Sequence, residues 1–353
     1  MGEKLMTIIS SPYFLREQHL VRMYEKFVKK FEKNLNPLQF GTFYVAASAQ
    51  LKDLESRIKF LEAQKGIDDA QAALLIKLEI VRCKNHVGDD LKTVDECKDL
   101  LEERKRDIES YMGILDSSIH SKFYRAALEF YQKRGPAAEF FKNSILFLTY
   151  TPLESIPVDE QLSFAAEVGK AALVGHNIYN FGELLQHPIV KVLDHTNYQW
   201  LSDLLFAFNA GDLEKYKRIF GELNGTQVFI FSTASQELLR SNQKFLEEKI
   251  RIMHFMEMVF RRPSDKRTIQ FTEVAKECDI KVEEVELLLM KSFSLKVVKG
   301  VIDQVDQTVR VKWVQPRVLD LKQIGTMKDR IQQWTKSVDE TTKIMEGNAG
   351  ELI

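Results

Sequence analysis

The stretch "KGVIDQVDQTVRVKWVQPR", residues 299–317, decides the fold because it predicts a β-hairpin near the end of a helical chain. In its second arm apolar and polar residues alternate, so Val309, Val311 and Trp313 share one side, which is the period of a half-buried strand. The bend falls at Asp306. The hairpin raises the question of whether it contacts a nucleic acid, a substrate or another protein.

The residues ahead of this hairpin predict the rest of a small domain. We expect a strand at Arg267–Gln270, a helix at Thr272–Cys278, a tight turn at Asp279–Lys281 and a second helix at Val282–Ser292. Helix, strand, helix, turn, helix and a two-stranded wing is the order of a winged-helix domain. The hairpin is then the wing, and it completes a three-stranded sheet.

Upstream, from about Pro12 to Phe260, apolar residues recur at spacings of three and four, which predicts amphipathic helices. Short breaks separate them, such as "HVGDDL" at residues 86–91 and "FNAGDL" at residues 208–213. In each, Gly supplies a left-handed residue that ends one helix, and Asp caps the next. Such tight reversals make neighbouring helices antiparallel, so we expect a solenoid of helical hairpins similar to tetratricopeptide repeats.

The fold class is therefore mostly α, with a helical-hairpin solenoid, a winged-helix domain and a C-terminal helix. We expect an N-terminal repeat region at residues 1–150, a second helical part at 151–260, the winged helix at 261–315 and a C-terminal helix and tail at 316–353. The segment Tyr150–Gln161 is the expected internal joint because it holds two prolines and no apolar period.

The charge of the chain argues against a nucleic-acid partner. Fifty basic and 51 acidic residues leave a net charge of −1, and residues 263–315 hold nine of each sign. Near the start of the second winged-helix helix, Glu283, Glu284 and Glu286 would repel phosphate, whose contacts supply most non-specific affinity. A basic cluster at Arg261, Arg262, Lys266 and Arg267 reads as a solvated loop, and its role stays open.

Protein–protein contact fits the winged helix better. A three-stranded sheet has an exposed edge that another chain's strand can extend. We expect a subunit interface there. The residues proposed for it are Val301, Ile302, Val309 and Val311.

The chain shows no recognisable catalytic motif, neither a phosphate-binding glycine loop nor a zinc-protease or nucleophile-elbow pattern. The best metal candidate is Cys83, His86 and Cys97, but a structural zinc site needs four ligands and no fourth lies nearby, so ordinary thiols on helix faces explain the cysteines better. We therefore expect no enzyme activity, no cofactor and no metal. An assembly subunit is the leading hypothesis, and an enzyme with an unrecognised site is the alternative. Three cysteines and no apolar run of membrane-spanning length favour an intracellular protein.

The C-terminal segment predicts a helix with a narrow apolar seam. Its members follow steps of three and four: Ile324, Met327, Ile331, Trp334 and Val338. Either the helix folds back on its own winged-helix domain, or the seam packs against helices of other chains. A two-in-seven stripe favours the second alternative, and Gly325 weakens the helix outside such a bundle.

Several segments resemble the PCI-domain family, which is shared by the proteasome lid, the COP9 signalosome and translation initiation factor three. They are "YNFGELLQHPIV" (179–190), "NYQWLSDLLFAFNAGDLEKY" (197–216), "MEMVFRRPSDKRTIQFTEVAK" (256–276), "VEEVELLLMKSFSLKVVKGVIDQVDQ" (282–307) and "WVQPRVLDLKQIGTMKDRIQQW" (313–334). The last segment is similar to lid subunits of the 26S proteasome regulatory particle, of the non-ATPase subunit nine type.

The resemblance implies a structural subunit of the lid that supports ubiquitin-dependent degradation in cytoplasm and nucleus. A neighbouring PCI subunit would bind the winged helix, and other lid subunits would bind the C-terminal helix in a bundle. The N-terminal solenoid would lie near the ubiquitin receptor. Another PCI assembly, the signalosome or initiation factor three, is the alternative. The family usually has further helical sequence upstream of the point at which Met1 stands, so whether Met1 is the true start stays open.

Overall fold

The computed structural model describes residues 19–30, 35–64, 69–87, 91–110, 117–225, 238–263, 266–316 and 321–349. The chain forms two compact units. The first comprises residues 1–178, 191–201 and 233–239, and the second comprises residues 179–190, 202–232 and 240–353.

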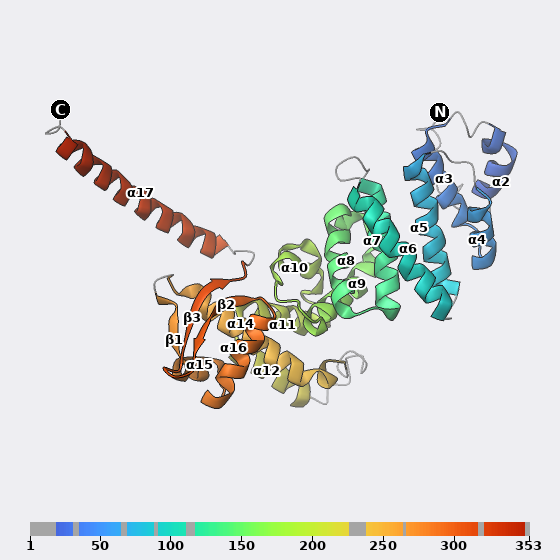
Figure 1. The fold of residues 1–353 in the computed structure, drawn as a ribbon. Coiled ribbons are helices and arrows are strands. Elements are labelled where there is room, and N and C mark those ends of the chain that lie inside the picture. Colours follow the sequence, from blue (N-terminus) through green and yellow to red (C-terminus); the bar gives the residue numbers. More distant parts are fainter. Residues whose placement is uncertain are drawn as a thin grey trace. The chain divides into compact units, whose positions relative to one another are not determined.

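The first unit is an array of helices (Figure 1). They are α2 (His19–Lys26), η1 (Val28–Lys30), α3 (Pro37–Ser48), α4 (Leu54–Glu62), α5 (Ala70–Val87), α6 (Leu91–Ser110), α7 (Ser117–Arg134), α8 (Ala137–Tyr150), η3 (Leu153–Ser155) and α9 (Val158–Val174). Helix α3 packs on α5, α5 on α7, and α7 and α9 both pack on α8. This order confirms the expected stack of helical hairpins.

Local chemistry begins these helices where the sequence allows it. The side chain of Asn36 accepts a hydrogen bond of 3.0 Å from the N–H of Leu38, and Pro37 takes the first helical position, where its missing N–H costs nothing. Asp53 caps α4 in the same way. The predicted apolar face of α5 is buried, with Leu75 and Leu78 almost inaccessible. The glycine of the predicted break at residues 86–91 lies outside the described residues.

After α9 the chain continues through α10 (Gly182–Gln186), η4 (Pro188–Leu193), α11 (Gln199–Ala210), α12 (Leu213–Gly225) and α14 (Gln243–Arg261). The second predicted break is confirmed in detail. Gly211 is left-handed with φ of 67°, and Asp212 accepts a 2.9 Å bond from the N–H of Lys215. A Cβ at position 211 would lie 2.8 Å from the backbone of His254, so the turn requires glycine both for its conformation and for its close approach to α14.

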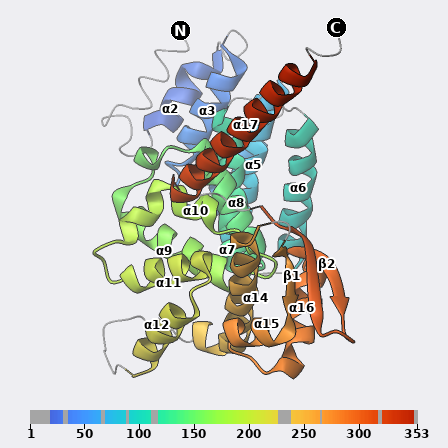
Figure 2. The ribbon, with the colours of Figure 1, turned by 90° about the vertical axis from the view of Figure 1, so that its left-hand side faces the viewer.

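The winged helix is present as predicted, and Figure 2 shows its sheet beside its helices. Its elements are β1 (Thr268–Gln270), α15 (Phe271–Cys278), α16 (Val282–Ser294), β2 (Val298–Asp303) and β3 (Thr308–Val314). The strand order is β1-β3-β2, with both pairings antiparallel. The turn between α15 and α16 uses Asp279 at φ of 51°, a left-handed position that Asp tolerates.

A β-bulge in the wing corrects one expectation. The register shifts between Lys299 and Gly300, so Trp313 does not continue the buried side formed by Val309 and Val311. Its side chain is 38% exposed, and the Lys299 ammonium lies 4.8 Å from its ring centroid. A Cβ on Gly300 would lie 2.5 Å from the carbonyl oxygen of Arg310, which explains the glycine at the bulge.

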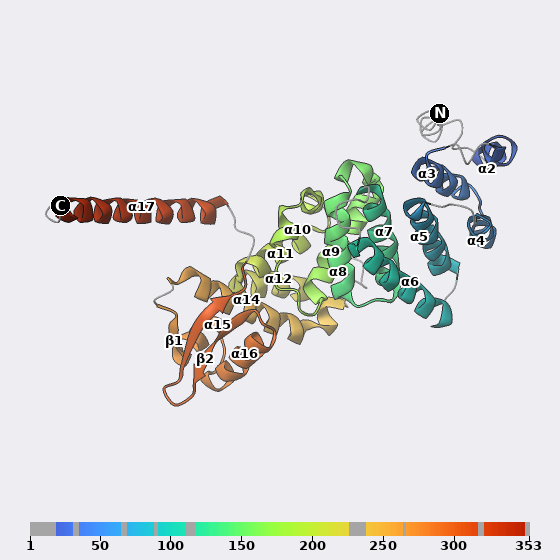
Figure 3. The same ribbon diagram turned by 45° about the horizontal axis from the view of Figure 1, so that its top comes forward.

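The last element is α17 (Leu321–Ala349), drawn in Figure 3 as one uninterrupted helix. Among the described residues, no helix combines the length and the apolar character needed to cross a bilayer.

The predicted fold class is confirmed: a helical array, a winged helix and a C-terminal helix. The domain boundaries stay predictions. The expected joint at Tyr150–Gln161 contains the short helix η3, and the Gln161 side chain donates to the carbonyl of Ile156 at 2.8 Å.

Candidate subunit-interaction surfaces

The sheet leaves β2 as an edge strand. The N–H of Val311 donates to the carbonyl of Arg267 at 2.9 Å, so that N–H of β3 faces β1. Along a β-strand the backbone N–H and carbonyl groups of successive residues point to opposite sides, so those of Arg310 face Val301 on β2. On β2, the N–H and carbonyl of Val301 face β3, and those of Ile302 point to the outer side. Within the described residues, position 302 therefore presents backbone groups at the edge that no other strand pairs.

The other two proposed edge residues lie elsewhere. Val309 and Val311 are on the central strand, and their side chains are 0% and 4% exposed. Strand β3 is paired on both sides at Val309, which stands opposite Ile269 and opposite Ile302. The sequence showed the hairpin but not that β1 would pair with β3, because that strand contributes only three residues. These two valines form core, so the edge hypothesis narrows to Val301 and Ile302.

Two of the three carboxylates near the start of α16 are used within the winged helix. Glu284 accepts from the N–H of Lys281, which begins the helix, and Glu286 accepts a 3.1 Å bond from the Gln304 side chain in the wing turn. Leu287 and Met290 on the same helix are exposed. A surface of carboxylates and apolar side chains does not suit a phosphate backbone.

The basic cluster is partly neutralised by its neighbours. Arg261 donates to Glu257 at 3.1 Å, one helical turn away, and Arg262 pairs with Glu273. Lys266 and Arg267 follow in the connection to β1. Two of the four cations thus already have carboxylate partners, which weakens the case for a phosphate-binding patch.

The seam of α17 is exposed along its length. The exposed fractions are 49% for Ile324, 47% for Met327, 57% for Ile331, 70% for Trp334 and 43% for Val338. Ile344 and Met345 continue the exposed apolar set. An indole left in water forgoes the large area that buried aromatic residues contribute. The structure thus shows an unfilled apolar stripe at the residues chosen from the sequence, and their role as an interface stays a proposal.

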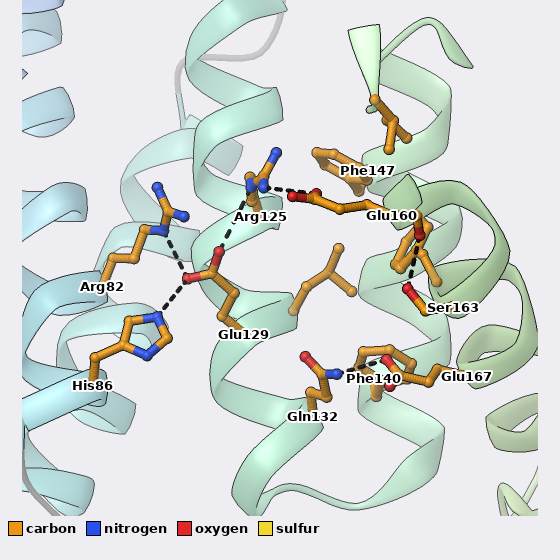
Figure 4. Close-up of a pocket in the computed structure, with 13 residues that line it drawn as sticks. Arg82, His86, Arg125, Glu129, Gln132, Phe140, Phe147, Glu160, Ser163 and Glu167 are labelled. Atoms are coloured by element: carbon orange, nitrogen blue, oxygen red, sulfur yellow. Dashed lines mark hydrogen bonds and ion pairs between the residues drawn. The ribbon is translucent and has the colours of Figure 1, made fainter. Parts of the chain in front are cut away.

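The first unit contains a charge network that the sequence analysis missed (Figure 4). Glu129 on α7 accepts from the Arg82 side chain at 2.7 Å and lies 3.3 Å from the His86 ring, both on α5. Arg125 lies 3.6 Å from Glu129 and donates at 3.3 Å to Glu160 on α9. Burial alone would raise the pKa of Glu129, but the bond from Arg82 and the surrounding cations outweigh it and lower that pKa.

The network has a regular spacing. The Arg125–Glu160 and Gln132–Glu167 bonds each join residues 35 positions apart, and both bonds run from α7 to α9. The donors are two helical turns apart on α7, as are the acceptors on α9. The two helices therefore lie in register as equivalent members of successive hairpins, with a period close to the roughly 34 residues of tetratricopeptide repeats. In the sequence, the available signal for this register was the recurrence, 35 residues apart, of polar residues that carry opposite charges or can form a hydrogen bond.

A second missed feature is a buried lysine in the second unit. Lys249 on α14 is 1% exposed, and its ammonium lies 5.7, 5.2 and 5.6 Å from the ring centroids of Tyr179, Phe181 and Phe245. Burial lowers the pKa of Lys249 to about 7, while the ring faces favour the charged form. The side chain ties α14 to the segment that carries "YNFGELLQHPIV".

The candidate metal ligands are not brought together. Cys83 and Cys97 belong to two different core clusters, and His86 is engaged with Glu129 and Lys133. Burial raises the pKa of both thiols. In the described part of the chain, no group of three or more His, Cys, Asp or Glu side chains could hold a metal ion. The arrangement fits the alternative of ordinary core thiols.

A helical array that leads into a winged helix defines the class, a PCI-domain protein, and comparisons with known proteins agree. Residues 1–205 match the family of PSD13 N-terminal repeats, residues 232–313 match the PCI domain, and residues 317–349 match the Rpn9 C-terminal helix.

Curated relatives extend over nearly the whole chain. The 26S proteasome non-ATPase regulatory subunit 13 of Dictyostelium discoideum is 35% identical over 354 residues, which covers 100% of this chain and 90% of the relative. The 26S proteasome regulatory subunit RPN9 of Saccharomyces cerevisiae is 32% identical, over 94% of this chain and 85% of the relative. The chain therefore belongs to the family of 26S proteasome non-ATPase regulatory subunit 13, or Rpn9.

The alternative PCI assembly has weaker support. Subunit M of eukaryotic translation initiation factor 3 from Aspergillus fumigatus is 22% identical over 198 residues, which covers 55% of this chain and 40% of the relative. Such partial similarity is consistent with a shared PCI fold. The proteasome resemblance identified from the sequence is thereby confirmed.

Proposed function

We propose that this chain is a non-catalytic structural subunit of the 26S proteasome regulatory particle lid, acting in ubiquitin-dependent protein degradation. The observation that carries the proposal is similarity to proteasome regulatory subunits along the full chain, including the C-terminal helix. A structural role also fits the charge network of α5, α7 and α9, in which Arg82, Glu129, Arg125 and Glu160 bind one another. The cytoplasm and nucleus are the compartments in which such a subunit would act.

The partner of the winged helix is a neighbouring PCI subunit. A strand of that neighbouring subunit would pair with β2. It would form backbone hydrogen bonds at Ile302 and contact the side chain of Val301, which is 53% exposed. The unpaired backbone at the edge supports this pairing. The partners of α17 are helices of several lid subunits, which would cover Ile331 and Trp334. The N-terminal array would lie near the ubiquitin receptor, as the resemblance implies.

The test is affinity purification of the full chain through a tag, with identification of the proteins that accompany it. We expect lid and other proteasome subunits in stoichiometric amounts. Signalosome or initiation-factor subunits instead would support another PCI assembly. A chain that purifies alone would contradict the structural role and favour an enzyme with an unrecognised site.

A further inference from the structure

Two adjoining hollows lie on the face of the first unit that carries the charge network. The first, of about 370 Å³, lies over Phe140, Phe147 and Ile156 and is bordered by Arg125 and Glu160. The second, of about 330 Å³, lies between the ends of α7 and α9 and reaches Val174. Both hollows share three lining residues, Gln132, Phe140 and Glu167, so they form one groove along α7 and α9.

Helical-repeat proteins bind extended ligands along surfaces lined by equivalent helices of successive repeats, and this groove is lined in that way. Helices α7 and α9 are equivalent members of successive hairpins, and each lines the groove with residues spaced at three and four. The floor is apolar because α8 contributes phenylalanines, of which Phe140 and Phe147 are each 5% exposed. An occupant lying along this groove would meet aromatic carbon below and polar groups on both sides.

The carboxylates of the groove differ in how far they are neutralised. Glu129 and Glu160 both pair with arginine, as Figure 4 shows. Glu167 instead accepts a 2.6 Å bond at one oxygen from the neutral Gln132 side chain, and no basic side chain among the described residues forms an ion pair with it. Burial raises the pKa of Glu167, and Lys170 only partly opposes this effect. The groove therefore contains one half-buried carboxylate that a cation would stabilise.

We propose that this groove binds a peptide segment of another protein, with a lysine or arginine side chain on Glu167 and an adjacent apolar side chain on the aromatic floor beside Phe140. A charge-assisted bond at Glu167 would orient the segment, and the phenylalanines would supply apolar contact. The two arginines of the groove already pair with carboxylates, which disfavours a polyanion as the occupant. The inference adds a binding site to the proposed lid contacts at β2 and α17.

The first experiment locates the occupant in the intact complex. Ser163, an exposed residue at the border of the groove, is replaced by the photoreactive residue p-benzoylphenylalanine in a tagged full-length chain. The complex is purified, irradiated, and mapped by mass spectrometry. We expect adducts in one segment that carries Lys or Arg beside an apolar residue, and no adduct in that segment from the same residue at exposed Glu154. Adducts confined to segments without a basic residue, or no adduct at position 163, would overturn the proposal.

The second experiment tests the ion pair. The mapped segment is synthesised with a fluorophore, and its dissociation constant for the full chain is measured. Glu167→Gln keeps an oxygen that can accept from Gln132 but removes the charge, so we expect binding about tenfold weaker. Glu154→Gln is the matched control and should leave affinity unchanged.

A double-mutant cycle completes the test. Changing the basic residue of the peptide to Gln should weaken binding to the native chain but not to Glu167→Gln. Additive losses would contradict the pairing. The melting temperature of Glu167→Gln serves as the folding control, and it should not fall, because burial already disfavours this charge in the native state. The complex is purified through the tag on this chain, so these tests do not depend on which other subunits accompany it. A negative result at the groove would therefore leave the lid proposal untouched, and the identity of the co-purifying subunits tests that proposal separately.

Discussion

Strand β3 and helix α17 have equally regular apolar patterns in the sequence, but within this chain only the apolar face of β3 is buried. In β3, Val309 is 0% exposed because β1 and β2 flank the strand and α14 packs against it. In α17, Trp334 is 70% exposed. Both patterns have the period of their element, so periodicity identifies a face that must be covered without showing which molecule covers it. The following changes separate coverage within the chain from coverage by other chains.

The largest effect is expected from Ile331→Ala combined with Trp334→Ala. If other lid subunits bury both residues, the pair loses about 3–6 kcal/mol of assembly free energy at roughly 1.5–3 kcal/mol each. The isolated subunit should keep its melting temperature because both side chains are already exposed. Incorporation is measured by co-purification, and folding by calorimetry. A large drop in the melting temperature would show that α17 packs on its own chain.

The opposite outcome is expected for Val309→Pro. The substitution removes an N–H that faces β1 within the sheet and forces a proline ring into the central strand, at a cost of about 3 kcal/mol or more. Hydrogen exchange should accelerate throughout the winged helix in the isolated subunit. Unchanged protection of β1 and β3 would mean that β3 is not paired on both sides.

An intermediate effect is expected from Lys249→Met, which tests how well the chain covers the interior of the second unit. Because burial lowers the pKa of Lys249 to about 7, the unfolded chain binds an additional proton between about pH 7 and the usual lysine pKa near 10.4. Stability should therefore rise with pH across that window. The methionine variant should be more stable at pH 7 by about 1–4 kcal/mol and should lack this rise.

Denaturant titrations of both proteins at several pH values measure the difference. The three rings favour the ammonium and reduce the effect. Equal pH profiles for the two proteins would show that the rings fully compensate for burial.

A smaller effect is expected at the edge of the sheet, where Ile302→Pro and Val301→Pro form a matched pair. Proline at 302 removes an outward N–H and should weaken assembly by about 1 kcal/mol, the scale of one hydrogen bond, with little change in the isolated fold. Proline at 301 removes an N–H that faces β3 and should lower stability first. Titration of each variant into a lid preparation, with circular dichroism as the control, distinguishes them. Normal assembly by a folded Ile302→Pro variant would argue against edge pairing.

The smallest effect is expected from changing Arg261, Arg262, Lys266 and Arg267 together to Ala. Assembly should be nearly unaffected, because Arg261 is exposed and ion pairs at a protein surface contribute about 0–1 kcal/mol. Native protein should bind random duplex DNA or RNA only weakly in a gel shift at moderate salt. Sub-micromolar binding with a steep salt dependence would show that the winged helix contacts nucleic acid.

Most of the fold was predictable because local signals repeat along the chain. Gly211 and Asp212 form the expected helix break, and the winged-helix elements lie within a few residues of their predicted positions. The bulge at Gly300 was not predictable, because it depends on how two strands register across the hairpin. It accounts for the unexpected exposure of Trp313.

The candidate surfaces were predictable only in part. The seam of α17 depends on spacing within one helix, and its five residues are all exposed as an unfilled stripe. The edge hypothesis chose four residues of one hairpin, and the pairing of β1 left two of them at the edge strand. The groove between α7 and α9 was not predicted, because its residues come from separate helices. They line one groove only when the two helices pack side by side in the register that joins Gln132 to Glu167.

The sequence by itself determined the class of fold, the places of the winged-helix elements, the apolar seam of α17 and the membership in a proteasome subunit family. These follow from periodicity, turn chemistry and resemblance, all of which act over short stretches of chain. Tertiary structure decided which strand is central, where Glu167 meets Gln132, and that Lys249 is enclosed by three aromatic rings. Each of these depends on contacts between distant residues, whose free energy is set by packing geometry and burial rather than by local sequence.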